Sequence, residues 1–143
     1  MQKIINGLLV DLTPGEVVAR EAEIAAAVAR TKPKAKAELA AIRYAKETGG
    51  ATVNGSPVAT DRETQAKLIA VRIKAKENPA YTVNWKTPAG FVSFDAPTII
   101  AIADGVADHI QACFDREAAL TASIDAAADQ AALDAIDLTV GWP

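Results

Sequence analysis

Three times along this 143-residue chain, two short β-prone arms around a turn are followed at once by a helix-capping signal. The turns are Asn6-Gly7, Asn54-Gly55 and the sequence TPAG at 87–90. Asn-Gly is a strong signal for a two-residue hairpin turn. The segments between the hairpins are rich in alanine, which favours helix and lets helices approach closely. We therefore predict an α+β fold that is mostly α-helical, with two or three short β-hairpins.

The first hairpin and the helix after it, residues 1–35, form a predicted docking segment. Thr13 and Glu16 have the spacing of a capping box, which places the start of the helix. The helix carries a narrow apolar stripe, closer to a coiled-coil seam than to the face of a globular helix, made of Val17, Ile24 and Val28. A lone hairpin is marginal in water. We expect this end to pair with another chain or to pack against one.

The remaining residues, 36–143, are predicted to form an α+β domain. A helix ends at Gly49-Gly50, and TDRE at 60–63 has the spacing of a second capping box, Thr60 with Glu63. The helix that follows is predicted to present one face made of Gln65, Leu68, Ile69, Arg72 and Ile73. The third hairpin alternates Tyr81, Val83 and Trp85 with polar residues, which is the period of a half-buried strand.

The longest predicted helix spans roughly 96–126, with Asp95 as its N-cap. Its apolar stripe consists of Ile99, Ile102, Val106, Ile110, Cys113, Leu120 and Ile124. Gly105 costs about 1 kcal/mol relative to alanine inside a helix, so we expect a close neighbour to require it. A short helix near 130–137 precedes the terminal LTVGWP. Trp142 there is interpreted as a plug, either into this domain or into a neighbouring subunit.

Charge is distributed unevenly along the chain, although its net value is only −3. Residues 1–94 carry a net +5 and residues 95–143 a net −8. Two explanations stay open: the two parts fold against each other, or the acidic part of one copy meets the basic part of another copy or of a partner.

The only histidine and the only cysteine, His109 and Cys113, are four residues apart and therefore share one face of the long helix. A structural zinc usually takes four Cys or His ligands, so one of each would need carboxylates, or further copies around a symmetry axis, to complete the set. A nucleophilic thiol would need a lowered pKa and an oriented base. We interpret the pair instead as packing or interface residues, and expect no metal, no cofactor and no catalytic residue.

Other common chemistries lack their signals. The serines lie in no nucleophile-elbow context, and no glycine-rich phosphate loop occurs. The best basic run, RIKAK at 72–76, lacks interleaved aromatic residues, so we expect no nucleic-acid binding. No run reaches the ~18 to 20 apolar residues of a membrane span. The start shows no signal peptide, and one cysteine excludes an internal disulfide. These features indicate a protein made in a reducing cytoplasm.

Four segments, taken in order, resemble a domain of unknown function from tailed bacteriophages that is associated with tail-fibre and tail-fibre-assembly proteins. They are TDRETQAKL, VNWKTPAGFVSFDA, HIQACFDREAAL and LDAIDLTVGWP. The similarity covers roughly 36–143, and the leading TPGEVVAREAEIAAAVA is similar to the helical segment that often precedes the domain. The family's recurring positions would here be Thr60, Asp61, Arg62, Trp85, Gly90, His109, Cys113, Gly141 and Trp142.

The resemblance implies a structural, non-enzymatic tail protein, either a tail fibre or an accessory or adaptor of the tail tip or baseplate. Its partners would be other tail or fibre proteins, and it would form a homo-oligomer, with a trimer favoured because fibres are commonly trimeric. The virion tail is the expected location, after synthesis in the host bacterial cytoplasm. The alternative is a tail-fibre assembly chaperone that is absent from the mature virion.

Overall fold

A computed structural model describes residues 1–5, 8–87 and 89–143, apart from the side chains of Ile5, Ala27 and Val28. The chain divides into two compact units, Met1–Thr31 and Lys32–Pro143. Along the sequence, the boundary between the two units lies four residues before the predicted one, because the second helix already begins at Lys32. Pro33 lies in its first turn, where proline's missing N–H is not needed for an intrahelical hydrogen bond.

The first unit contains one hairpin and one helix. Strands β1 (Gln2–Ile5) and β2 (Leu8–Asp11) pair antiparallel, and helix α1 spans Pro14–Val28. The predicted turn at Asn6-Gly7 lies outside the described residues. The predicted capping box is confirmed: Thr13 Oγ1 accepts a hydrogen bond from the Glu16 N–H, and the Glu16 carboxylate accepts one from the Thr13 N–H.

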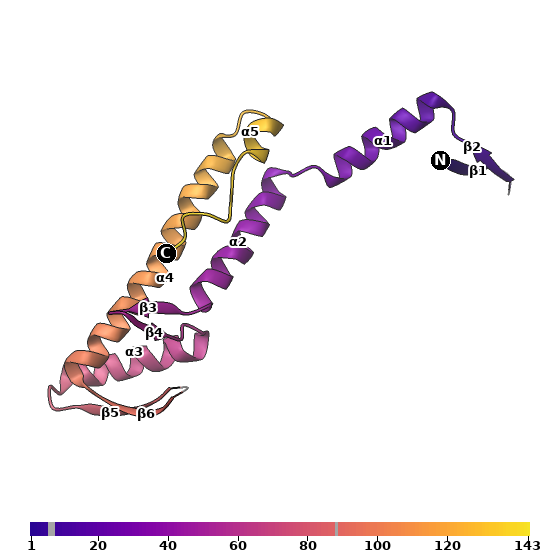
Figure 1. Cartoon of the computed structure of the whole chain (residues 1–143). Coiled ribbons are helices and arrows are strands. Elements are labelled where there is room, and N and C mark those ends of the chain that lie inside the picture. Colours follow the sequence, from indigo (N-terminus) through magenta and orange to yellow (C-terminus); the bar gives the residue numbers. More distant parts are fainter. Residues whose placement is uncertain (6–7, 88) are drawn as a thin grey trace. The chain divides into compact units, whose positions relative to one another are not determined.

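The second unit is built around its longest helix, against which two other helices pack (Figure 1). Its helices are α2 (Lys32–Thr48), α3 (Arg62–Glu77), α4 (Ala96–Ala126) and α5 (Gln130–Asp134). Its strands are β3 (Ala51–Val53), β4 (Ser56–Val58), β5 (Thr82–Thr87) and β6 (Gly90–Asp95), which form two antiparallel hairpins. The α+β fold with short hairpins is therefore confirmed for the described residues.

Helix α4 carries two apolar cores, one toward each end. The first gathers side chains of α3, α4 and both hairpins, including Val53, Leu68 and Ile99. The second gathers side chains of α2, α4 and the C-terminal segment, including Leu39 and Ile124. The bounds predicted for α4 and its cap at Asp95 are confirmed, since the Asp95 carboxylate accepts a hydrogen bond from the Thr98 N–H.

The hairpin β3–β4 forms as its turn residues predict. Asn54 has φ 52° and Gly55 has φ 79°, so both occupy the left-handed region that a two-residue turn of this kind requires. The hairpin also explains Gly105 on α4. A Cβ placed on Gly105 would lie 2.5 Å from Cγ1 of Val53 on β3. The predicted close neighbour is thus the side chain of Val53.

The predicted N-cap of α3 is wrong. Its N-cap is Asp61, whose carboxylate accepts a hydrogen bond from the Thr64 N–H, and not Thr60. Thr60 is instead fully buried, and its hydroxyl accepts a hydrogen bond from the Gly50 N–H at 2.9 Å.

The face predicted for α3 is covered only in part. Leu68 is buried with Ala75, whereas Ile69 and Ile73 are exposed. Helix α4 and the hairpins approach only one side of α3, so part of the predicted stripe stays in solvent.

Opposite charges meet within the second unit. Nζ of Lys36 on α2 lies 2.6 Å from Oδ1 of Asp125 on α4. Nε of Arg72 on α3 lies 2.5 Å from Oδ1 of Asp104 on α4. The basic and acidic parts of the sequence therefore pair inside one chain, which supports the first of the two explanations for the uneven charge.

Candidate functional site

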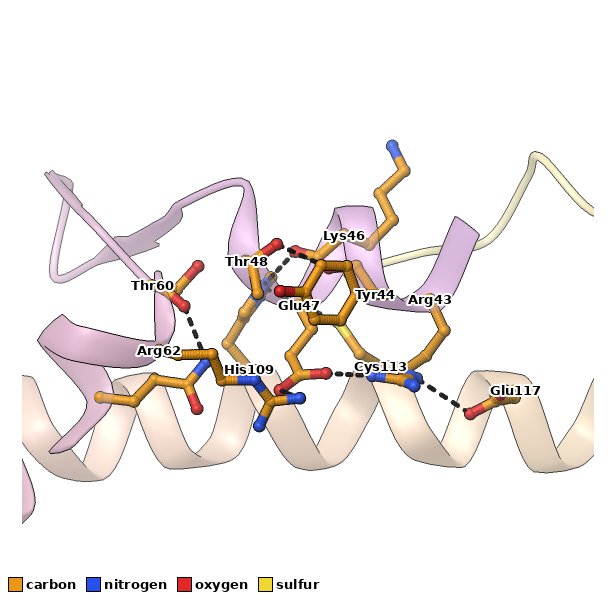
Figure 2. A network of polar contacts seen from close by, with 11 residues as sticks. Arg43, Tyr44, Lys46, Glu47, Thr48, Thr60, Arg62, His109, Cys113 and Glu117 are labelled. Carbon is orange, nitrogen blue, oxygen red and sulfur yellow. Dashed lines mark hydrogen bonds and ion pairs between the residues drawn. The ribbon is translucent and has the colours of Figure 1, made fainter. Parts of the chain in front are cut away.

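His109 and Cys113 lie on the side of α4 that faces the last turns of α2, as Figure 2 shows. His109 Nε2 is 3.1 Å from the carbonyl oxygen of Lys46. Lys46 lies in the last turn of α2, which ends at Thr48. Carbonyls at a helix C-terminus lack intrahelical partners, and an imidazole N–H satisfies one of them here. Cys113 Sγ is 3.8 Å from the same Nε2 and is fully buried.

The electrostatics of Cys113 are those of a packed thiol. Burial raises the pKa of the Cys113 thiol, and the negative charge of Glu47 raises it further, against smaller opposing effects of Arg43 and Lys46. A catalytic cysteine needs the opposite, a lowered pKa with access to substrate. At neutral pH this thiol stays protonated and inaccessible.

The metal interpretation gains no further ligands from the fold. Within residues 1–5, 8–87 and 89–143, no group of three or more His, Cys, Asp or Glu side chains is placed to hold a metal ion. Nε2 of His109 is also hydrogen-bonded to the backbone carbonyl of Lys46. Among the described residues, one chain therefore offers no metal-ligand group beyond the pair already seen in the sequence.

A buried carboxylate next to this pair was missed by sequence reasoning. Glu47 at the end of α2 is fully buried and forms an ion pair with Arg43, one turn earlier on the same helix. Nη2 of Arg62, at the start of α3, lies 3.0 Å from Glu47 Oε1. Arg43 Nε also donates a hydrogen bond to Glu117 Oε2 of α4 at 3.1 Å. Two guanidinium groups thus compensate one buried charge (Figure 2).

Aromatic rings border both arginines of this Glu47 network, defined as Glu47, Arg43, Arg62 and Glu117. The guanidinium carbon of Arg43 is 4.5 Å from the ring centre of Phe114, and that of Arg62 is 5.6 Å from the ring centre of Tyr44. Both distances suit cation–π attraction. The network joins α2, α3 and α4 without presenting a free acid, base or nucleophile, so it fixes the positions of three helices.

Only part of the Glu47 network had a sequence signal. Arg43 and Glu47 have the i, i+4 spacing of a helix ion pair, but such pairs normally lie on the surface. Arg62 and Glu117 are distant in sequence, and only the packing of α3 and α4 brings them to the end of α2.

Both tryptophans pack within the second unit. Trp85 of β5 is half-buried against the first core and lines an apolar groove of about 430 Å³ between the two hairpins and α4. Trp142 is half-buried against the second core, and its indole N–H donates a hydrogen bond to the Leu138 carbonyl at 2.9 Å. Arg116 holds the preceding Val140 carbonyl through two hydrogen bonds. The terminal segment therefore closes onto its own domain.

Of the predicted stripe on α1, the two residues with described side chains, Val17 and Ile24, belong to neither apolar core. Val17 is half-buried and Ile24 is exposed, while the side chain of Val28 lies outside the described residues. In the first unit, none of the described side chains is buried. The ammonium of Lys3 pairs with the Glu16 carboxylate, and hydrogen bonds from Lys3 and Thr13 lower the pKa of the Glu16 carboxyl to about 2.

Comparisons with known proteins place most of this chain in one family. A family model described as "Domain of unknown function (DUF4376)" matches residues 29–137. Neither the search of curated proteins nor the search of solved structures finds a match. Among the described residues, no helix has both the length and the apolar character to cross a membrane.

Proposed function

The chain belongs to the DUF4376 family, a domain of unknown function, and we propose that it is a structural, non-enzymatic protein of a bacteriophage tail. It acts through protein–protein contacts, as part of a tail fibre or as an accessory or adaptor of the tail tip or baseplate. The four sequence segments that resemble tail-associated domains support the tail setting.

The proposed mode of action rests on how densely the two units expose large apolar side chains. The first unit exposes seven large apolar side chains within 31 residues, whereas the second exposes seven within 112, counted over the described residues. Isolated exposed apolar residues are ordinary, but a dense group of them marks an interaction surface. The second unit is a packed domain, and the first unit is the part that we expect to bind a partner.

The chemistry of the candidate site favours a structural role over catalysis. His109 spends Nε2 on a helix carbonyl, and burial of Cys113 keeps its thiol protonated. Glu47, the other buried ionisable group of the site, is compensated by two arginines. These residues hold α2, α3 and α4 together, which is the work of a scaffold.

The proposed partners are other tail or fibre proteins, together with further copies of this chain. A trimer is the favoured oligomer, because the resemblance is to fibre-associated proteins and fibres are commonly trimeric. The first unit would supply the contacts among copies or with the tail, and the second would be carried as a folded domain.

The proposal is tested by quantitative mass spectrometry of purified particles from a phage that encodes this chain. A tail component is expected at a fixed ratio to the other tail proteins, in intact particles and in isolated tails. Absence from particles, with presence in the infected-cell lysate, would contradict the structural role and support a fibre-assembly chaperone instead.

A further inference from the structure

The inner face of the β5–β6 hairpin is only partly covered by the first core. Trp85 on β5 is paired with Val92 on β6, and Val83 with Phe94, so these four side chains share one face of the hairpin. Trp85 and Phe94 pack against the first core, yet Val92 is 41% exposed. An apolar side chain that stays open to solvent on the core-facing side indicates space between the hairpin and its neighbours.

That space is a groove of about 430 Å³, which we call the hairpin groove. Its walls are β4, the β5–β6 hairpin and the N-terminal part of α4. Sites for small molecules typically have volumes of about 300 to 1,000 Å³ and are mostly apolar, with a few polar groups that fix the ligand. The apolar lining of this groove includes Val58, Trp85, Val92, Phe94, Ile99 and Ile102.

Most of the polar lining of the hairpin groove lies at the turn ends of the two hairpins. Asn54 and Ser56 belong to the turn and first strand residue of β3–β4, and Lys86 and Thr87 to the end of β5. Lys86 is the one charged side chain in the lining. It is exposed, and no carboxylate in the described part of the chain pairs with it. One end of the groove therefore carries an uncompensated positive charge.

A free hydrogen-bond donor adds to this charge. The indole N–H of Trp85 has no acceptor within residues 1–5, 8–87 and 89–143, whereas the indole N–H of Trp142 donates to the Leu138 carbonyl. The Asp95 carboxylate, directly before α4, accepts a hydrogen bond from the Thr98 N–H and is not part of the lining. The groove thus combines apolar walls with a cation and a free donor, which is complementary to a ligand with an apolar body and an anionic head.

From these observations we propose that the hairpin groove binds a single-chain amphipathic anion, the carboxylate of a fatty acid. The alkyl chain lies against Trp85, Val92 and Ile102, and the carboxylate pairs with the ammonium of Lys86 at the turn ends of the hairpins. The long stem of a lysine suits this position, because it can follow an apolar wall while its charge stays at the rim. The site belongs to the second unit and does not depend on the proposed role in a phage tail.

Titration of the full-length protein with sodium decanoate, followed by isothermal titration calorimetry, tests the site. We expect one decanoate per chain, with a dissociation constant of roughly 0.1 to 1 mM for a ligand of this size. Dodecanoate should bind roughly 15-fold tighter, because each further buried CH₂ group tightens binding about fourfold. Far-ultraviolet circular dichroism at the same concentrations shows that the helices stay intact.

Decyltrimethylammonium is the matched probe, with the same chain length and the opposite head charge. It should bind at least about tenfold more weakly than decanoate, because it cannot pair with Lys86. The whole chain carries a net charge of −3, so non-specific attraction would favour this cation over the anion. A preference for decanoate therefore reports the local charge of the groove.

One pair of variants tests the head-group contact. Lys86→Gln should weaken decanoate binding roughly tenfold and should not weaken the binding of decyltrimethylammonium. Lys46→Gln is the matched control, because Lys46 is an exposed lysine on α2 that does not line the groove. It should leave both affinities unchanged.

A second pair tests the apolar wall. Val92→Asp places a carboxylate in the groove and should weaken decanoate binding at least about tenfold. Phe91→Asp is its control, because Phe91 is the preceding residue on β6, is 74% exposed, points to the opposite face and does not line the groove. In a Trp142→Phe background, Trp85 is the sole tryptophan, and its emission should change with decanoate along the calorimetric binding curve.

The outcomes decide the proposal in either direction. Selective loss of decanoate binding in Lys86→Gln and in Val92→Asp supports it. Absence of saturable decanoate binding to the natural chain, or equal affinity for decanoate and decyltrimethylammonium, would overturn it. Equal losses in Val92→Asp and Phe91→Asp would place any binding outside the groove and overturn it as well. If Val92→Asp does not fold, the calorimetry of the natural chain and of Lys86→Gln still gives the decision.

Discussion

The contact between Gly105 of α4 and Val53 of β3 gives a sharp test of how the β3–β4 hairpin seats on the long helix. A Cβ on Gly105 would lie 2.5 Å from Val53 Cγ1 and 3.1 Å from Cγ2. Overpacking of this kind costs about 1 to 3 kcal/mol, whereas alanine gains about 1 kcal/mol over glycine inside a helix. We expect Gly105→Ala to lower the free energy of unfolding by about 1 kcal/mol.

The same substitution should change sign when Val53 is shortened. Val53→Ala removes both Cγ atoms and alone costs about 2 kcal/mol, from lost burial and a small cavity. In that background the Cβ of residue 105 has room, and only the helix preference remains. Gly105→Ala should then stabilise by about 1 kcal/mol, which makes the coupling energy about 2 kcal/mol.

Urea denaturation of the four proteins, followed by far-ultraviolet circular dichroism, measures this cycle. Ala107→Gly serves as the control for helix preference, because Ala107 is exposed on the same helix two residues later. It should cost about 1 kcal/mol. If Gly105→Ala stabilises the natural chain as much as it stabilises the Val53→Ala variant, the two residues are not in contact and the reasoning fails.

Four further outcomes are expected. Glu47→Ala should destabilise by about 3 kcal/mol, because two arginines lose a buried carboxylate, and Glu47→Gln should cost clearly less in the same urea titration. Asp95 has a pKa lowered by its hydrogen bonds to Thr98, so its cap stabilises α4 above the unfolded-state pKa of the carboxyl and is lost as pH falls through the lower folded-state value. Asp95→Asn keeps a cap without a charge and should flatten that acid dependence of the melting temperature. Trp142→Ala should cost about 2 kcal/mol, below the ~3–5 range for a fully buried tryptophan, and an unchanged melting curve would mean that the indole does not pack on its own domain. The Cys113 thiol should react with a colorimetric disulfide reagent only after denaturant is added, and reaction at the native-state rate of a free thiol would contradict its burial.

Much of the secondary structure was predictable because its signals act within a few residues. The Thr13–Glu16 box, the Asp95 cap and the Asn54-Gly55 turn each depend on neighbours no more than four residues apart. The capping of α3 was wrong because two candidate caps stood side by side. Thr60 is buried and its hydroxyl accepts a hydrogen bond from the Gly50 N–H, whereas the side chain of Asp61 caps the helix.

Only the part of the candidate site that depends on local spacing was predictable. Periodicity placed His109 and Cys113 on one face of α4, but it held no information on what that face meets. The partner turned out to be the end of α2, where Lys46 offers a carbonyl and Glu47 a buried charge. Arg62, the second arginine paired with that charge, is distant in sequence and is brought there by the position of α3.

By itself, the sequence determined where α1 and α4 begin, where the Asn54-Gly55 turn lies, that α4 would be the longest helix, and that Gly105 needed a close neighbour. These follow from backbone preferences and side-chain periods, which are local. Only the tertiary structure decided which face of α3 is buried, leaving Ile69 and Ile73 in solvent, and which side chains surround Cys113. Burial depends on which elements meet in space, and for residues far apart in the chain that is set by the packing of whole helices, not by the spacing of their residues.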